Sequence, residues 1–152
     1  MKNIDEKYMK IALIEAQKAY QKGEIPVGAV IVKNGEIIAT AHNTREIENS
    51  CLGHAEINAI NKACKVLNSW RLDDCELYVT LEPCPMCAGA IISSRIERTV
   101  FGAFDEKQGC FGSVCDLSAM RFSKTPYIKS RVLENECKQI IKIFFENLRK
   151  NP

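Results

Sequence analysis

The segment from Glu76 to Ser94 limits the fold most strongly, because its character changes within a few residues. It begins with the apolar run ELYVT at 76–80, which is typical of a buried strand. LEPC follows, and from Pro85 the chain is rich in small residues, as in a helix that starts with proline at its first position. A buried strand that leads through a short turn into a helix indicates an α/β protein.

The rest of the chain alternates between strand and helix patterns in the same way. Residues 5–22 and 54–67 carry apolar side chains at intervals of three and four, which predicts helices. Asn34-Gly35 between two apolar runs predicts a β-hairpin. The full set of expected elements is helices at 5–22, 54–67, 85–94 and 134–150, strands at 27–32, 37–40, 76–80, 97–101 and 127–133, and a short helix near 116–120. We expect one domain over residues 1–152, with a single mixed sheet and helices on both of its faces.

The composition is that of an ordinary globular protein, with 46% hydrophobic and 26% charged residues. No run of 18 apolar residues is present, so we expect no transmembrane helix. The N-terminal segment carries acidic residues and lacks an apolar signal core, which favours a cytoplasmic location without membrane association. Disulfides are rare in that compartment. The cysteines outside ligand spacing are therefore expected to be small buried or half-buried residues: Cys51, Cys64, Cys75, Cys110, Cys115 and Cys137.

The charge is unevenly distributed along the chain. Residues 121–152 hold eight Lys or Arg and three Glu, a net +5, whereas residues 1–120 hold thirteen and sixteen, a net −3. The basic C-terminal part fits contact with a polyanion such as nucleic acid. Charge alone, however, favours the simpler interpretation of a solvated helix face.

Four residues in two short motifs form the candidate chemical centre. His54 and Glu56 form an H-x-E motif at the start of a predicted helix, and Cys84 and Cys87 form P-C-x-x-C at the start of another. This order of motifs is the signature of zinc deaminases. Cys84 and Cys87 lie three residues apart on one helix face, so both sulfurs can reach one ion. With His54 they make the three-ligand set of a catalytic zinc, and Glu56 beside them can transfer protons.

Three other interpretations compete with a catalytic zinc. The C-x-x-C pair fits a redox dithiol, although that leaves His54 and Glu56 unexplained. A structural zinc site needs a fourth protein ligand, for which Cys51 is the nearest candidate in sequence. All three ligand residues could also be ordinary core side chains.

With these motifs, the chain resembles the bacterial tRNA-specific adenosine deaminases of the cytidine deaminase-like superfamily. The similar segments are GEIPVGAVIVKNGEIIA at 23–39, AHNTRE at 41–46, HAEINAI at 54–60, WRLDDCELYVTLEPCPMCAGAIISSRI at 70–96, VFGAFDEKQGCFGS at 100–113 and FFENLRK at 144–150. The resemblance implies a three-layer α/β/α sandwich around a five-stranded mixed sheet. It also implies one zinc ion per subunit, a homodimer, and conversion of the wobble adenosine of a tRNA anticodon to inosine.

The same resemblance implies roles for individual residues. Glu56 would carry a proton from water to N1 of adenine and then protonate the departing ammonia. Asn43 matches an asparagine that touches the flipped nucleotide, and Asp105 matches an aspartate in the substrate-side loop. Val27 and Phe145 fall where apolar residues wall the base pocket or contact the neighbouring nucleotide. The simpler alternatives are that Asn43 closes the hairpin exit, that Asp105 orders its loop, and that Phe145 is a core residue.

Two segments depart from the pattern of that family. Residues 51–53 read CLG before the H-A-E motif, where the family usually has P-T-A, which places a flexible glycine next to His54. The segment 120–133, which includes Phe122–Tyr127, lacks the family's asparagine–histidine element. Because both segments border the nucleic-acid side in the family, a deaminase of a free base or nucleoside, such as guanine, cytosine or adenosine, is the alternative function.

Overall fold

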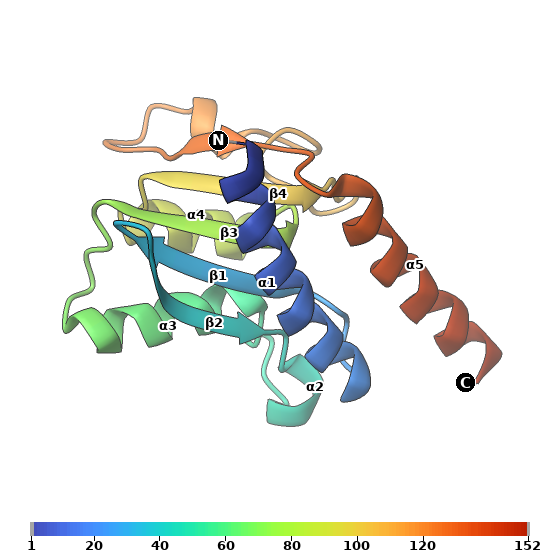
Figure 1. Cartoon of the computed structure of the whole chain (residues 1–152). Helices are drawn as coiled ribbons and strands as arrows, with labels where there is room; N and C mark the ends of the chain where they lie inside the picture. The colour runs from blue at the N-terminus through green and yellow to red at the C-terminus, as the bar shows by residue number, and fades with distance from the viewer. Residues whose placement is uncertain (1, 152) are drawn as a thin grey trace.

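The centre of the protein is a mixed five-stranded sheet, seen in a computed structural model that describes residues 2–151 (Figure 1). Its strand order is β2-β1-β3-β4-β5. The strands are β1 (Gly28–Lys33), β2 (Glu36–His42), β3 (Cys75–Leu81), β4 (Arg98–Ala103) and β5 (Tyr127–Lys129). β1 pairs antiparallel with β2 and β3, whereas β3, β4 and β5 run parallel. The mixed sheet predicted from the sequence is confirmed.

Helices cover both faces of this sheet. They are α1 (Lys2–Gln21), α2 (Arg45–Glu48), α3 (Ala55–Leu67), α4 (Pro85–Ser93) and α5 (Glu134–Lys150), with a short 3-10 helix η1 (Leu117–Ala119). α1 packs on β1, β2 and β3, and α5 contacts β4 and α1 on the same side. α3 packs on β1 and β2 beside α4, behind the sheet in Figure 1, while α5 extends away from the body. This arrangement is the three-layer α/β/α sandwich.

Side chains of the strands contribute to two apolar cores, one on each face of the sheet. Along β1, Ala29 and Ile31 belong to the core under α3 and α4, whereas Val30 and Val32 belong to the core under α1. This alternation follows from the two-residue period of a strand. Because both faces are covered, the central strands are apolar at nearly every position.

The β1–β2 hairpin forms where Asn34-Gly35 predicts it. Asn34 has a φ of 51° and Gly35 a φ of 78°, so both central residues of the turn are left-handed. That conformation is the type I′ turn that asparagine and glycine favour. At the other end of β1, a Cβ on Gly28 would lie 1.9 Å from the carbonyl oxygen of Ala12. Glycine at this position therefore lets α1 lie directly on the sheet.

The structure corrects some of the expectations. The helix α2 was not predicted, because four residues are too few to show a helical period. The last strand ends at Lys129 instead of residue 133, since Arg131 and Leu133 have positive φ angles that interrupt an extended strand. The prediction of buried or half-buried cysteines holds for four positions and is wrong for Cys51 and Cys115, which are exposed. Among residues 2–151, no helix is both long and apolar enough to cross a bilayer.

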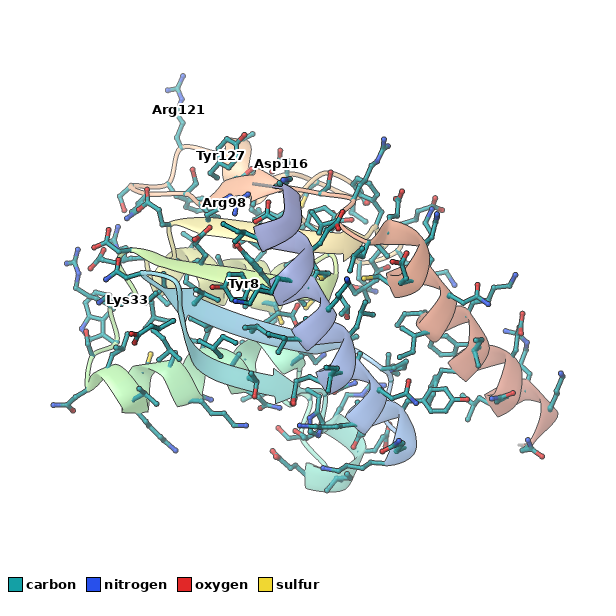
Figure 2. The ribbon with its side chains drawn as sticks, viewed as in Figure 1. Tyr8, Lys33, Arg98, Asp116, Arg121 and Tyr127 are labelled. Atoms are coloured by element: carbon teal, nitrogen blue, oxygen red, sulfur yellow. The ribbon has the colours of Figure 1, made fainter. Side chains whose placement is uncertain are left out.

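A buried ion network ties α1 to the amino ends of the parallel strands. Asp5 on α1 accepts hydrogen bonds from Arg98 at 2.9 and 3.0 Å, from Lys129 at 2.6 Å and from the Tyr78 hydroxyl at 3.0 Å. Figure 2 shows Arg98 close to α1, whereas Arg121 projects away from the body. Asp5 is 5% exposed as a residue, and its carboxylate is fully supplied with hydrogen-bond donors.

Candidate functional site

Two helix starts bring the three possible metal ligands together. His54 is the residue just before α3, and Cys84 is the residue just before α4, with Pro85 at the first helical position. His54 Nδ1 lies 3.6 Å from Cys84 Sγ and 3.5 Å from Cys87 Sγ. The structure thus unites three residues that the sequence separates by thirty positions.

The spacing of these atoms fits a tetrahedral zinc ion. With Zn–S of about 2.3 Å and Zn–N of about 2.0 Å at tetrahedral angles, a ligand nitrogen and sulfur lie roughly 3.5 Å apart. Both observed nitrogen–sulfur distances match that value. Within the described chain, the group of possible ligands consists of His54, Cys84 and Cys87, and exposed Cys51 is not among them. A closed four-ligand site that uses Cys51 therefore finds no support.

The protein groups alone already shift the pKa values of these three side chains. A hydrogen bond from Cys87, helped by His54 and opposed by burial, lowers the pKa of Cys84 to about 4. The same contact with Cys84, together with burial, holds the pKa of Cys87 well above its usual range. Contact with Cys84 raises the pKa of His54. Two sulfurs that share one proton are suited to a divalent cation, which would replace that proton.

Glu56 is the second residue of α3, in its first turn, next to this cluster. Its side chain is 4% exposed and lines the same pocket as His54 and Cys84. Burial raises the pKa of Glu56 to about 7, with a further rise from the negative Cys84 and opposing effects from its own backbone N–H, from His54 and from Cys87. A carboxyl group with a pKa near neutrality is suited to both giving and taking a proton at pH 7.

The pocket above the cluster has a volume of about 180 Å³. Its walls come from the segments before β1 and after β2, from the start of α3, and from the segments that follow β3 and β4. The lining residues are Ile25, Val27, Asn43, Arg45, His54, Ala55, Glu56, Leu81, Glu82, Cys84, Asp105 and Gln108. Seven of the eight residues that sequence analysis selected thus lie at this site, with Cys87 buried beneath it.

The two predicted polar contacts also have structural partners. Asn43 is buried, donates to the Ile25 carbonyl at 3.3 Å and accepts from the Arg45 amide at 3.1 Å. Asp105 accepts from the amides of Lys107 and Gln108 at 3.1 and 3.2 Å. Each side chain therefore orders its own segment, and both line the pocket, while their contact with a substrate stays a prediction.

Phe145 lies apart from the others. It is on α5, is 36% exposed and contacts Phe144 edge to face, and it is not among the pocket-lining residues. Its exposure argues against the interpretation as a core residue. Contact with a neighbouring nucleotide stays a prediction.

The departure at residues 51–53 has a local explanation. The Gly53 carbonyl accepts from Thr44 at 2.8 Å, and a Cβ on Gly53 would lie 2.9 Å from the Arg45 nitrogen. The glycine therefore allows close approach between the segment before His54 and the start of α2. It is buried and hydrogen-bonded in a turn, not the flexible link that the sequence suggested.

Sequence reasoning missed two buried carboxylates beside the pocket. Glu24, 0% exposed, accepts from the amides of Glu46 and Ile47 at 3.0 and 2.7 Å and so fixes the start of α2. Glu82, 2% exposed, accepts from the amides of the loop that carries Asp105. For Glu82 the one available signal was an acidic residue directly after an apolar strand, whereas Glu24, between α1 and β1, gave none.

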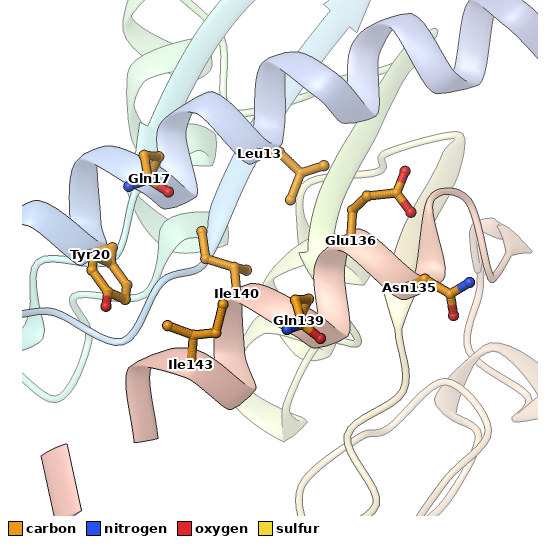
Figure 3. Close-up of a pocket in the computed structure, with 8 residues that line it drawn as sticks. All are labelled: Leu13, Gln17, Tyr20, Asn135, Glu136, Gln139, Ile140 and Ile143. Carbon is orange, nitrogen blue, oxygen red and sulfur yellow. The ribbon is translucent and has the colours of Figure 1, made fainter. Parts of the chain in front are cut away.

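A larger groove, about 680 Å³, separates α1 from α5 (Figure 3). Its walls are mostly apolar or amide side chains, such as Leu13, Gln17, Ile140 and Ile143, and Glu136 is the one charged residue among them. The groove offers neither a set of metal ligands nor an acid–base pair. The smaller pocket is therefore the candidate for chemistry.

Comparisons with known proteins assign the class. The family model described as MafB19-like deaminase matches residues 3–149. This range contains the whole sheet and every pocket-lining residue. The chain thus belongs to a family of deaminases.

Closer relatives define the family. A tRNA-specific adenosine deaminase of Bacillus subtilis (strain 168) is 56% identical over 147 residues, covering 96% of this chain and 91% of the relative. One from Aquifex aeolicus is 46% identical over 152 residues, covering 96% and 97%. A solved structure from work on A-to-I editing by tRNA:A34 deaminases has a TM-score of 0.85 and 40% identity, covering 88% and 97%. The chain belongs to the family of tRNA-specific adenosine deaminases.

A solved guanine deaminase of Bacillus subtilis is also similar, with a TM-score of 0.63 and 34% identity. It covers 78% of this chain and 86% of its own. The likeness is weaker than that to the tRNA:A34 deaminase in TM-score, identity and coverage.

Proposed function

We propose that this protein converts the wobble adenosine of a tRNA anticodon to inosine, with release of ammonia. The observation that carries the proposal is the joint placement of His54, Glu56, Cys84 and Cys87 at one pocket. The high identity to relatives named tRNA-specific adenosine deaminase supports the choice of substrate. The enzyme is proposed to act as one domain over residues 1–152, as a homodimer in the cytoplasm.

His54, Cys84 and Cys87 would hold one Zn²⁺ per subunit. One imidazole and two thiolates are ligands that favour zinc over harder cations. When bound, zinc supplies Lewis acidity, which activates water at neutral pH. The start of α4 assists, because a helix N-terminus stabilises the thiolate form of Cys84.

Glu56 would move the protons of the reaction. As a carboxylate it accepts a proton from the attacking water and passes it to N1 of adenine, which makes C6 more electrophilic. In the second half it takes the proton of the new C6 hydroxyl and delivers it to the amino group, so that the C6–N bond breaks, ammonia leaves and the C6 carbonyl forms. A pKa of about 7 lets Glu56 occupy both protonation states without a large free-energy penalty.

The pocket walls would select and orient the base. Val27 offers apolar surface against the ring, and Asn43 and Asp105 offer polar groups at the rim. Phe145 on the outlying α5 would contact a nucleotide next to the flipped base. The net +5 charge of residues 121–152 would attract the phosphate backbone.

Deamination of a free base or nucleoside is the second candidate. The observation in its favour is the guanine deaminase structure at 34% identity. The segments 51–53 and 122–127, which depart from the family pattern, border the surface that is proposed to contact RNA. A free base would not need that surface.

Ammonia release separates the two functions. The zinc-loaded protein is assayed on an anticodon stem-loop RNA with adenosine at the wobble position, and on guanine, cytosine, adenosine and cytidine. The same stem-loop with guanosine at the wobble position is the matched control. We expect turnover on the adenosine stem-loop alone, with binding that weakens steeply as salt rises. Turnover on a free base or nucleoside, with none on the RNA, would overturn the proposal.

A further inference from the structure

Glu82 occupies an unusual place beside the candidate site. It follows β3 directly, two residues before Cys84, and its side chain is 2% exposed. Its backbone N–H donates to the Ala103 carbonyl at the end of β4, at 2.9 Å. The carboxylate is thus held at the end of the two central parallel strands, on the wall of the pocket.

Four hydrogen bonds saturate this carboxylate, and all come from one loop. Oε1 accepts from the Asp105 amide at 3.1 Å and from the Ser113 hydroxyl at 2.5 Å. Oε2 accepts from the amides of Phe111 and Ser113 at 3.0 and 3.1 Å. An ionised carboxylate has about four acceptor sites, so none is left for a substrate or a metal ion. Glu82 therefore acts through the loop.

The loop lies against Glu82 without a gap. A Cβ on Gly109 would lie 2.2 Å from Cδ of Glu82, so only glycine lets the backbone pass there. The next residue, Cys110, donates its amide to the Pro83 carbonyl at 2.9 Å. Residues 82 and 83 thus bind the loop just before the chain reaches Cys84.

The same loop forms one wall of the pocket. Asp105 and Gln108 are its lining residues. Glu82 holds the amide of Asp105 itself, and Gln108 lies in sequence between that amide and the amide of Phe111. The loop falls between the end of β4 at Ala103 and the start of η1 at Leu117, so no strand or helix supports it there. The carboxylate of Glu82 and the bond from the Cys110 amide to the Pro83 carbonyl tie it to the segment that leads to Cys84.

We propose that Glu82 is a positioning residue that sets the distance between the Asp105–Gln108 wall and the residues His54, Glu56 and Cys84. The proposal rests on the proposed function, because that wall is where the nucleotide would bind. Exchange of the carboxylate for an amide replaces one of its two oxygens with an NH2 group, which then faces the N–H or O–H donors bound at that oxygen. Those donors then lose their acceptor in a buried place, and the loop shifts or loosens.

The test is Glu82→Gln, compared with Ser113→Ala and with Asp5→Asn. Ser113→Ala removes one of the four donors at a residue outside the pocket. Asp5→Asn alters an equally buried carboxylate at the far end of the sheet. Steady-state kinetics on the anticodon stem-loop, zinc content and amide hydrogen exchange are measured for all three.

We expect Glu82→Gln to raise KM roughly tenfold, the cost of about one charged hydrogen bond, while zinc content is retained and kcat falls less than KM rises. Ser113→Ala also raises KM, but by a smaller factor than Glu82→Gln does. A fourth protein that combines Glu82→Gln with Ser113→Ala has a KM no higher than that of Glu82→Gln alone, because both changes act through one contact. Hydrogen exchange speeds up at the amides of Asp105, Phe111 and Ser113. Asp5→Asn lowers stability and leaves KM unchanged.

Two results would overturn the proposal. One is an unchanged KM and unchanged exchange in the loop for Glu82→Gln with full zinc content. The other is an equal rise of KM in Asp5→Asn, which would show a general effect of stability. If Glu82→Gln does not fold, Ser113→Ala tests the proposal instead: a raised KM with faster loop exchange supports it, and no change in either measurement overturns it. A wild-type protein that is inactive on the RNA counts against the proposed function alone, since the exchange measurement still tests the loop.

Discussion

A buried carboxylate lies at each end of the central strands, and the pKa values of the two groups are shifted in opposite directions. At the amino ends, Asp5 is 5% exposed, and at the carboxyl ends Glu56 is 4% exposed. Burial raises the pKa of both groups. For Asp5, hydrogen bonds from Arg98, Lys129 and Tyr78 outweigh burial and bring the pKa well below its usual range. For Glu56 burial prevails, and the pKa reaches about 7.

The comparison teaches that burial alone does not decide what a carboxylate does. Asp5 meets cations and a hydroxyl, so it stays charged and joins α1 to β4 and β5. Glu56 meets sulfur atoms and an imidazole in an open pocket, so it can exchange a proton. One end of the sheet holds the fold together, and the other end is arranged for chemistry.

The largest expected effect is the loss of a metal ligand. Cys87→Ala should abolish zinc binding and reduce RNA deamination to background, because two ligands cannot hold zinc tightly. It should also lower the melting temperature. Metal analysis and calorimetry check this result. Cys75→Ala, an equally buried thiol at the start of β3, is the control and should keep its zinc. A Cys87→Ala variant with full zinc and activity would contradict the ligand assignment.

The next effect is on stability at the opposite end. Asp5→Asn should lower the free energy of unfolding by about 3 kcal/mol, because Arg98 and Lys129 lose their buried partner. It should leave kcat and zinc content unchanged. Urea denaturation measures the change. The control is Asp73→Asn, which breaks an exposed pair with Arg71 and should lower the free energy of unfolding far less, because solvent screens exposed pairs. An equal decrease of the free energy of unfolding in the two variants would show that the buried network contributes no more to stability than an exposed ion pair.

A smaller effect concerns pH. Because the pKa of Asp5 is depressed in the folded protein, its stabilisation is complete above the unfolded value of about 3.9 and is lost as pH falls through the lower folded value. The stability gap between wild type and Asp5→Asn should therefore be constant from pH 7 to 5 and narrow below about pH 4. Any loss of bound metal in acid would be common to both proteins, so the difference between their stabilities isolates the contribution of Asp5. A gap that widens toward low pH would reverse the sign of the argument.

Much of this site could be predicted from sequence because its signals are local. Cys84 and Cys87 share a helix turn, and His54 and Glu56 share another, so each pair has a fixed spacing that a motif records. The long strand and helix patterns likewise gave the layers of the fold.

The missed features depend on distant contacts. Glu24 reaches amides 22 and 23 residues away, and Glu82 reaches amides 23, 29 and 31 residues away. In sequence each is only an acidic residue beside an apolar run. The short α2 and the exposure of Cys51 and Cys115 have the same cause, because tertiary packing and not local pattern decides them.

The most direct test of the central contrast is inosine formation by Glu56→Gln on the anticodon stem-loop, with zinc measured in the same sample. The change keeps the volume of the side chain and removes its ability to transfer a proton. The account predicts full zinc content, an unchanged melting temperature, and a deamination rate lower by about 10³-fold. A rate within tenfold of wild type, with zinc bound, would show that Glu56 is not the proton carrier and would contradict the division of roles between the two ends of the sheet.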